Sequence, residues 1–288
     1  MTDRYAVVGN PVAHSLSPAI HTAFARETGQ DIEYVKLLAP LDAFTPTVAQ
    51  FRAAGGKGVN VTVPFKFEAL KLSALPSPEA NEAQAANTLD FRDAKIRAYN
   101  TDGSGLVGDL ARNLGFSIAG QRVLIMGAGG ATNGVVHPVL RAAPALLVVC
   151  NRTLDKAVAV IERLRHVPEF SATGLAAKSY AALSGMQFDL VINATSAGLH
   201  NEMPPLPSKI FARGALAYEM VYGRKTAFMT FAQTQSARVV DGLGMLVEQA
   251  AAAFEIWRGV RPDSRAVLAE LRRRDSRTGS EAQPCGSG

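Results

Sequence analysis

The sequence predicts an α/β fold with mostly parallel sheets, and three observations lead to this prediction. Short apolar runs rich in β-branched residues alternate with helical patterns along almost the whole chain, which is typical of parallel sheets. Near the middle of the chain, an apolar strand is followed directly by a glycine-rich turn and a helix. The composition, with 48% hydrophobic and 19% charged residues among 288, is that of a globular chain long enough for two domains.

The N-terminal part of the chain predicts one α/β unit. Its expected strands are Tyr5–Gly9, Glu33–Leu38 and Gly58–Val61, followed by a hairpin of Thr88–Phe91 and Ile96–Tyr99. Its expected helices are Ser17–Thr28, Leu41–Ala53 and Phe65–Leu72. We expect Ser17 to cap the first helix, because its hydroxyl can accept a backbone N–H and Pro18 suits the first helical position.

A second unit is expected to begin near Gly103, after Asp102 as the N-cap of a helix over Thr101–Gly115. Its expected strands are Arg122–Met126, Ala145–Cys150, Phe188–Ala194 and Ala215–Val221, and its helices are Ala131–Arg141 and Leu154–Arg165. Helices over Gly242–Arg258 and Pro262–Arg274 follow. The small, polar stretch from Ser276 is expected to be disordered.

Composition and charge argue against several other classes of protein. No apolar run approaches the roughly 18 residues of a membrane span, and the N-terminal residues lack the apolar core of a signal peptide. Two distant cysteines, Cys150 and Cys285, build neither a disulfide framework nor a zinc site, so we expect a cytoplasmic protein without metal. Most of the net charge of +5 lies between Arg258 and Arg277 beside a single aromatic, Trp257. A solvated helix face is therefore favoured over a nucleic-acid surface.

The glycine-rich turn comprises Gly127, Ala128, Gly129, Gly130 and Ala131, and it opens a helix directly after the strand Arg122–Met126. Glycines let the backbone approach a pyrophosphate, whose charge is favourable at a helix N-terminus. A turn without any ligand is the plainer alternative. The strand before the turn and the helix after it favour the interpretation as a dinucleotide-binding turn.

The end of the next strand carries cations where an NAD-binding protein usually carries an acid. Asn151, Arg152 and Thr153 follow this strand, and Lys156 lies one helical turn further on. A guanidinium and an ammonium suit a 2′-phosphate. A cation at a helix start is mildly unfavourable without such a partner, so the pattern indicates NADP.

Two further segments place polar groups at strand–helix junctions, where α/β sites lie. Lys66 ends the run Val59–Lys66, and Asp102 lies in the run Tyr99–Gly103. Each residue alone is readily explained as a solvated lysine or a helix cap, but together they offer a Lys–Asp pair. Ser15 and Ser17 alternate on the loop after the first strand and can bind a carboxylate or a polyhydroxy ligand. The histidines show no metal-ligand spacing.

Eight motifs together resemble the shikimate dehydrogenase family over roughly residues 4 to 272. They are GNPVAHSLSP, NVTVPFK, AANTL, YNTDG, GAGGATNG, NRT, NATSAG and GLGMLVEQAA, in this order. The resemblance implies NADP-dependent, reversible reduction of 3-dehydroshikimate to shikimate in aromatic amino-acid biosynthesis. It also implies an N-terminal α/β substrate-binding domain (1–102, completed by helices of 240–275), a Rossmann-like NADP-binding domain (103–239) and an active site in the cleft between them. Residues 276–288 would form a disordered tail.

The resemblance also assigns roles to residues at matching positions. Lys66 and Asp102 would be the catalytic pair, and the substrate would be held by Ser15, Ser17, Thr62, Asn87, Tyr222 and Gln249. The cofactor would be held by Gly127, Ala128, Gly129, Gly130, Ala131, Asn151, Arg152, Thr153, Lys156, Thr195, Met220, Gly242 and Met245. No metal, nucleic acid or membrane is implied, and a monomer or a homodimer fits equally.

Several positions depart from the family pattern. Asn133 stands where the glycine turn usually carries an Arg, Leu16 replaces a common lysine, Glu219 replaces an Asp, and Glu248 replaces a frequent His. None of these changes removes a residue of the catalytic pair. A quinate/shikimate or related cyclitol-acid dehydrogenase with looser cofactor choice therefore stays open as an alternative, and a binding protein without turnover is less favoured.

Overall fold

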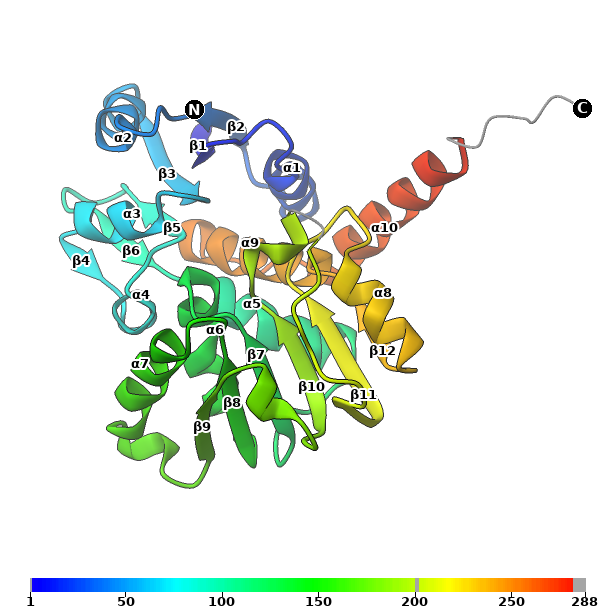
Figure 1. The fold of residues 1–288 in the computed structure, drawn as a ribbon. Helices are drawn as coiled ribbons and strands as arrows, with labels where there is room; N and C mark the ends of the chain where they lie inside the picture. The colour runs from blue at the N-terminus through cyan, green and yellow to red at the C-terminus, as the bar shows by residue number, and fades with distance from the viewer. Residues whose placement is uncertain (1, 200–201, 282–288) are drawn as a thin grey trace, which may run out of the picture.

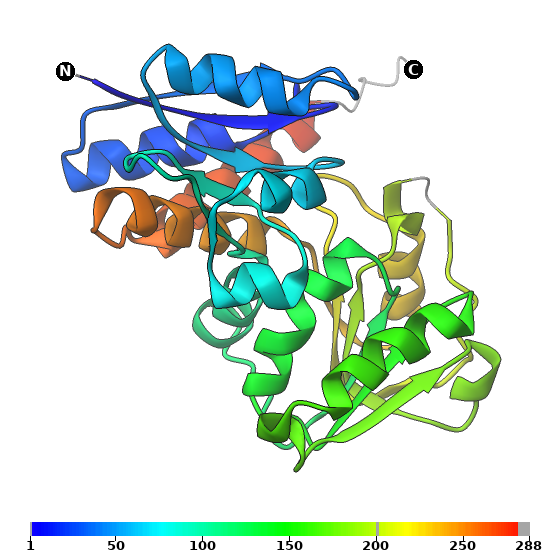
Figure 2. The same ribbon diagram turned by 90° about the vertical axis from the view of Figure 1, so that its left-hand side faces the viewer.

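The computed structural model describes residues 2–199 and 202–281, and within these residues the chain forms two six-stranded sheets surrounded by helices (Figure 1). The first sheet comes from the N-terminal third of the chain and the second from the middle. This confirms the predicted α/β class. In the side view the two sheets form separate layers, and the last helices lie beside the first sheet (Figure 2).

The first sheet has the strand order β2-β1-β3-β5-β6-β4. Its strands are β1 (Asp3–Gly9), β2 (Ile32–Leu38), β3 (Gly56–Val61), β4 (Leu75–Pro76), β5 (Thr88–Asp90) and β6 (Arg97–Tyr99). β1 lies between β2 and β3 and is parallel to both, whereas β5 is antiparallel to β3 and β6. The expected hairpin is therefore present.

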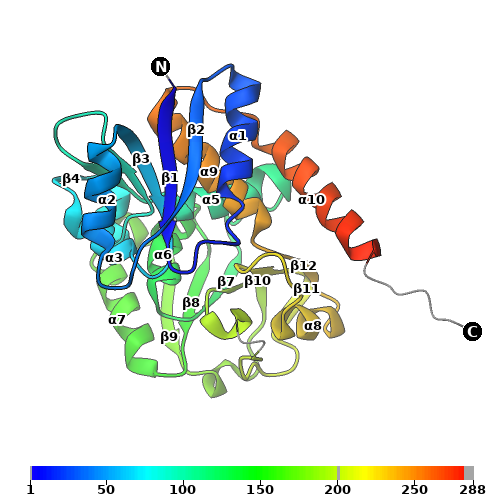
Figure 3. The same ribbon diagram turned by 90° about the horizontal axis from the view of Figure 1, so that it is seen from above.

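Helices from both ends of the chain cover the first sheet. They are α1 (Ser17–Thr28), α2 (Phe44–Ala53), α3 (Lys66–Leu72), α4 (Pro78–Ala83), α9 (Leu243–Arg258) and α10 (Ser264–Glu281). α1 ends at Gly29, whose φ of 64° is left-handed and suits glycine. Ile20 and Phe24 of α1 share one buried cluster with Phe254 of α9 and Leu271 of α10. The C-terminal helices thus return to the first sheet, and Figure 3 shows the three helices together.

The second sheet is parallel throughout, with the order β12-β11-β10-β7-β8-β9. Its strands are β7 (Arg122–Met126), β8 (Leu146–Cys150), β9 (Gly174–Lys178), β10 (Phe188–Asn193), β11 (Phe211–Glu219) and β12 (Arg238–Val240). The associated helices are α5 (Asp102–Gly108), which continues as a π-helical turn over Asp109–Asn113, α6 (Gly130–Arg141), α7 (Leu154–Arg165) and α8 (Ala227–Thr234). Buried clusters cover both faces. β7 has β8 on one side and β10 on the other, so the strand order reverses there, which is where ligands bind in such sheets.

Three local expectations were wrong. Ser17 does not cap α1: it is the first helical residue, and its hydroxyl oxygen accepts from Ser15 Oγ at 3.1 Å. Asp102 is likewise the first residue of α5, with Thr101 before it. The helix α10 continues to Glu281, seven residues beyond the end expected at Arg274. The rest of the expected tail, 282–288, lies outside the described residues.

Five short elements were not expected: β4, α4, β9, α8 and β12. β9 is an edge strand whose residues are at most half-buried, so it lacks a continuous apolar run. α4 does carry a signal, because Ser77 accepts from the Ala80 N–H at 3.2 Å and proline follows at the first helical position.

Candidate active site

Lys66 and Asp102, which are 36 residues apart in sequence, form an ion pair. Lys66 begins α3 just after β3, and Asp102 begins α5 just after β6. Lys66 Nζ lies 2.5 Å from Asp102 Oδ2, and the two side chains are 28% and 11% exposed. The pair is therefore mostly withdrawn from water but still reachable, as a group that exchanges protons with a ligand must be.

Asn87 holds the other oxygen of this carboxylate. Its Nδ2 donates to Asp102 Oδ1 at 2.9 Å and lies 3.2 Å from Gln249 Oε1. Its Oδ1 accepts from the Thr101 N–H at 2.9 Å. Both oxygens of Asp102 are thus bonded, one to Lys66 and one to Asn87, which fixes the orientation of the carboxylate.

The ion pair faces a cavity of about 480 Å³ between the two sheets. Eleven of the predicted site residues line it: Ser15, Ser17, Thr62, Lys66, Asn87, Asp102, Met220, Tyr222, Gly242, Met245 and Gln249. They come from the loop after β1 and the start of α1, the ends of β3 and β11, the residue before β5, and the helices α3, α5 and α9. The volume and the mixed lining suit a small polyhydroxy ligand.

The serines form the end of this cavity nearest to α1. Ser15 Oγ donates to Ser17 Oγ at 3.1 Å and accepts from the Ser17 N–H at 3.3 Å. Tyr222 reaches the same loop from the second sheet, and it packs with Leu16 against one buried cluster. Burial of Tyr222 raises the pKa of its hydroxyl, so it is a neutral donor at physiological pH.

The glycine turn lies at the end of β7, where the strand order reverses. Gly127 has a φ of 99°, and a Cβ there would lie 3.1 Å from the Ala194 carbonyl oxygen. A Cβ on Gly129 would meet nothing within 4 Å, so the space in front of α6 is open. Open space at the N-terminus of a helix of this length fits a pyrophosphate. Ala131 follows in the first turn of α6.

The remaining predicted cofactor residues lie at neighbouring strand ends and do not line the cavity. Asn151 Nδ2 donates to the Thr153 carbonyl at 2.9 Å, which shapes the turn between β8 and α7. Arg152, on this turn, and Lys156, in the first turn of α7, are exposed and therefore accessible to a phosphate group. Thr195 follows β10 and donates to Asn193 Oδ1 at 2.7 Å. These residues therefore mark a strip beside the cavity that suits an extended dinucleotide.

The structure supplies a cation near one departure from the family pattern. Arg163, on α7, donates from Nη2 to Asn133 Oδ1 at 2.9 Å. A guanidinium thus stands beside Asn133 although the side chain at that position is itself neutral.

Sequence reasoning missed some residues at the site. Asn60, His14 and Arg224 also line the cavity. Asn60 had a signal, because it lies two residues before Thr62 in an extended run and so shares its face. Phe67 is 48% exposed and approaches the glycine turn from the first sheet, with its Cζ 3.7 Å from a Cβ built on Gly130.

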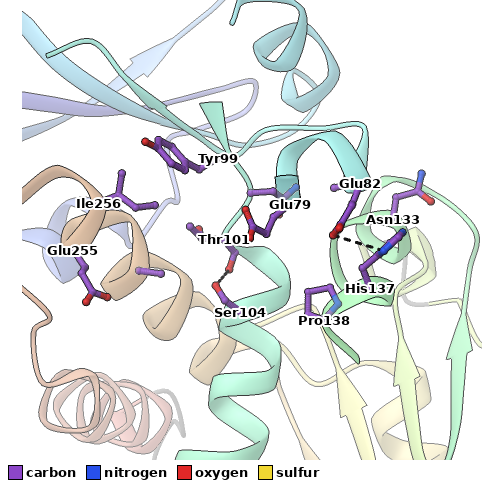
Figure 4. Close-up of a pocket in the computed structure, with 14 residues that line it drawn as sticks. Glu79, Glu82, Tyr99, Thr101, Ser104, Asn133, His137, Pro138, Glu255 and Ile256 are labelled. Atoms are coloured by element: carbon purple, nitrogen blue, oxygen red, sulfur yellow. Dashed lines mark hydrogen bonds and ion pairs between the residues drawn. The ribbon is translucent and has the colours of Figure 1, made fainter. Parts of the chain in front are cut away.

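A second cavity of about 310 Å³ lies between α4, α6 and α9 (Figure 4). Thr101 lines it, although the next residue along the chain, Asp102, lines the first cavity. Three glutamates, Glu79, Glu82 and Glu255, line it, and Glu82 lies 2.5 Å from Arg141 and 3.6 Å from His137. The residues that line it include none of the predicted catalytic, substrate or cofactor residues, so the larger cavity is the candidate for chemistry.

A doubly wound parallel sheet with a glycine turn at its switch point, next to a cavity that holds a Lys–Asp pair, defines a dinucleotide-dependent oxidoreductase. No three His, Cys, Asp or Glu side chains gather as a metal site in the part of the chain that the structure describes. Among the same residues, no helix is both long and apolar enough to cross a membrane.

Comparison with known proteins identifies the family. The chain matches the shikimate dehydrogenase substrate-binding domain over residues 7–89, the shikimate/quinate 5-dehydrogenase model over 109–201 and the shikimate 5′-dehydrogenase C-terminal domain over 242–272. The shikimate dehydrogenase (NADP(+)) of Methylobacillus flagellatus is 56% identical, covering 94% of this chain and 99% of that protein. The enzyme of the same name from Nitrosospira multiformis is 54% identical over 94% and 98%. The chain therefore belongs to the shikimate dehydrogenase family.

Solved structures of related enzymes have the same fold. The shikimate 5-dehydrogenase of Thermus thermophilus, crystallised with NADP(H) and shikimate, has a TM-score of 0.82 and 33% identity over 95% of this chain and 100% of its own. An Ael1 enzyme from Pseudomonas putida has a TM-score of 0.89 and 48% identity over 94% and 98%.

Proposed function

We propose that this protein is an NADP-dependent shikimate dehydrogenase, which interconverts 3-dehydroshikimate and shikimate in aromatic amino-acid biosynthesis. The observation that carries the proposal is the Lys66–Asp102 pair, held in a cavity between the substrate-side loops and the switch point of a parallel sheet. NADP(H) supplies or accepts the hydride when it is bound. Its proposed ligands are the glycine turn, the turn that carries Arg152, and the residues Thr195, Met220, Gly242 and Met245.

The residues of this chain have separate tasks in the proposed mechanism. When the substrate carbonyl is reduced, its oxygen needs a proton, and Lys66 Nζ donates it; in the reverse direction Lys66 accepts it. Asp102 orients the ammonium through its Oδ2, while Asn87 holds Oδ1. Ser15 and Ser17 bind the carboxylate of the substrate at the other end of the cavity. Thr62, Tyr222 and Gln249 hold the ring and its hydroxyls, so that the reacting carbon is presented in one orientation.

We propose the domain division 1–102 with 240–275 for the substrate and 103–239 for the cofactor. All strands of the first sheet lie within residues 3–99 and those of the second within 122–240, which supports this division. A cytoplasmic location fits the unpaired, buried Cys150, whose thiol pKa burial raises to about 12. For the assembly we propose a monomer or a homodimer.

The test is the absorbance of reduced nicotinamide with shikimate or quinate and NADP or NAD. We expect the highest kcat/KM for shikimate with NADP. Higher kcat/KM for quinate, or for NAD, would instead support the quinate/shikimate paralogue. No turnover with any pair would refute the proposed activity.

A further inference from the structure

Glu219 is a buried carboxylate that the proposed mechanism does not use. It ends β11 and is fully buried. Its Oε2 accepts from Asn193 Nδ2 and from Thr226 Oγ1, each at 2.8 Å. Its Oε1 accepts from the Val221 N–H at 3.1 Å. Burial raises the pKa of this carboxyl, and neutral donors offset part of that cost.

This carboxylate joins two segments at the cofactor end of the cavity. Asn193, which donates to it, accepts in turn from Thr195 Oγ1 at 2.7 Å and from the Thr195 N–H at 3.2 Å. Val221, which also donates to it, lines the cavity together with Met220 and Tyr222. This side chain therefore links the Thr195 turn, after β10, to the cavity wall after β11, in addition to the backbone pairing of the two strands.

The wall segment Met220–Tyr222 is also held by backbone contacts. The Met220 N–H donates to the Asn193 carbonyl and the Gly242 N–H to the Val221 carbonyl, each at 3.2 Å. A Cβ on Gly242 would lie 2.1 Å from the Met220 carbonyl oxygen, so the two backbones are in direct contact. Beyond them, Tyr222 packs against the same buried cluster as Leu16, which lies between the two serines. A shift at Glu219 is therefore transmitted to both ends of the cavity.

We propose that Glu219 is a positioning residue of the dehydrogenase: it fixes the Thr195 turn against the Met220–Tyr222 wall, and so the fit of cofactor and substrate to each other. The inference rests on the proposed function. Glu219 does not line the cavity and is not among the proposed cofactor ligands. It acts only through Asn193, Thr226 and Val221.

The test is Glu219→Gln, which keeps the shape of the side chain but replaces one acceptor oxygen by an NH₂ group. Whichever way the amide turns, at least one donor loses its acceptor. We expect the KM for NADP and the KM for shikimate each to rise about five- to tenfold, and kcat/KM to fall at least tenfold, since small misplacements are costly in oriented reactions. Titration with NADPH, followed by its fluorescence, should give a dissociation constant about fivefold higher.

Two further variants separate positioning from stability. Asp90→Asn removes charge from another buried carboxylate, which binds Arg92 away from the cavity; it should lower the melting temperature and leave both KM values unchanged. Thr226 does not line the cavity, and Thr226→Val removes its hydrogen bond to Glu219; this variant should raise the KM for NADP about threefold. It tests the same inference if Glu219→Gln does not fold.

Unchanged KM values and NADPH affinity in a folded Glu219→Gln enzyme would overturn the inference. Equal KM changes in Asp90→Asn would also overturn it, because they would show a general effect of stability. Failure of the wild-type enzyme to oxidise shikimate would instead refute the proposed function, so the two failures are distinguishable.

Discussion

Replacing Lys66 with methionine removes the ammonium from the Lys–Asp pair and keeps most of the aliphatic side chain. General acid–base help of this kind is typically worth about 10²–10⁴ in rate, or about 3–5.5 kcal/mol of activation free energy. We therefore expect kcat to fall by about 10²–10⁴. The KM for shikimate should change little, because Ser15 and Ser17, the proposed site for the carboxylate, line the other end of the cavity.

The same substitution has a cost in stability. Asp102, only 11% exposed, would keep its bond from Asn87 but lose its cation. Breaking a buried pair costs about 3–5 kcal/mol, and the 28% exposure of Lys66 favours the lower end. At roughly 2–4 °C per kcal/mol for a chain of about this size, the melting temperature should fall by about 6–12 °C.

The assay is the initial rate of NADPH formation from shikimate, with kcat and KM determined separately well below the melting temperature of the variant. Lys71→Met is the matched control, since Lys71 is exposed in the last turn of the same helix, and it should change neither rate nor stability. A Lys66→Met enzyme within a few-fold of the wild-type kcat would refute the catalytic assignment.

Three other predictions test separate parts of the molecule. The double variant Ser15→Ala/Ser17→Ala should raise the KM for shikimate more than it lowers kcat, because hydroxyl donors to a carboxylate act in binding; an unchanged KM in steady-state kinetics would show that the serines are only structural. Arg152→Ala should narrow the preference for NADP over NAD about ten- to hundredfold, mainly by raising the KM for NADP, since a charge-assisted contact is worth about 1.5–3 kcal/mol; equal kcat/KM ratios in wild type and variant, at fixed ionic strength, would contradict this. Burial lowers the pKa of His21 to about 3 from 6.5, so below pH 6.5 the unfolded chain binds a proton that the folded chain does not, and stability falls as pH falls towards the folded pKa. Between pH 6.5 and 4.5 this amounts to about 2 kcal/mol, and denaturant unfolding of His21→Phe at both pH values should show less acid sensitivity than the wild type.

The candidate site was partly predictable because its residues lie in short motifs with local signals. The run from Asn60 to Lys66 places alternate side chains on one face of an extended segment. The glycine turn directly follows a buried strand, which predicts an anion site at the N-terminus of α6. Sequence reasoning still assigned Ser17 and Asp102 to helix caps, because local patterns do not distinguish a cap from the first helical residue.

Contacts across long sequence separations were beyond the reach of these patterns. Asn87 and Gln249 are 162 residues apart, yet they share one hydrogen-bond network with Asp102. Arg163 reaches Asn133 from a neighbouring helix, and Glu219 receives donors from two strand ends. Local patterns give none of these residues a role, and Asn87 and Gln249 were predicted only through the family resemblance.

The sequence by itself determined the α/β class, the alternation of strands and helices, and the chemical types at the strand ends, because these follow from hydrophobic periodicity and backbone preferences over a few residues. Only the tertiary structure decided the order of the strands and the 2.5 Å contact of Lys66 with Asp102. The return of α9 and α10 to the first sheet was implied by the family resemblance and by no local pattern. These features depend on which buried surfaces pack together. That packing is set by the summed burial of residues far apart in the chain, and no local window contains it.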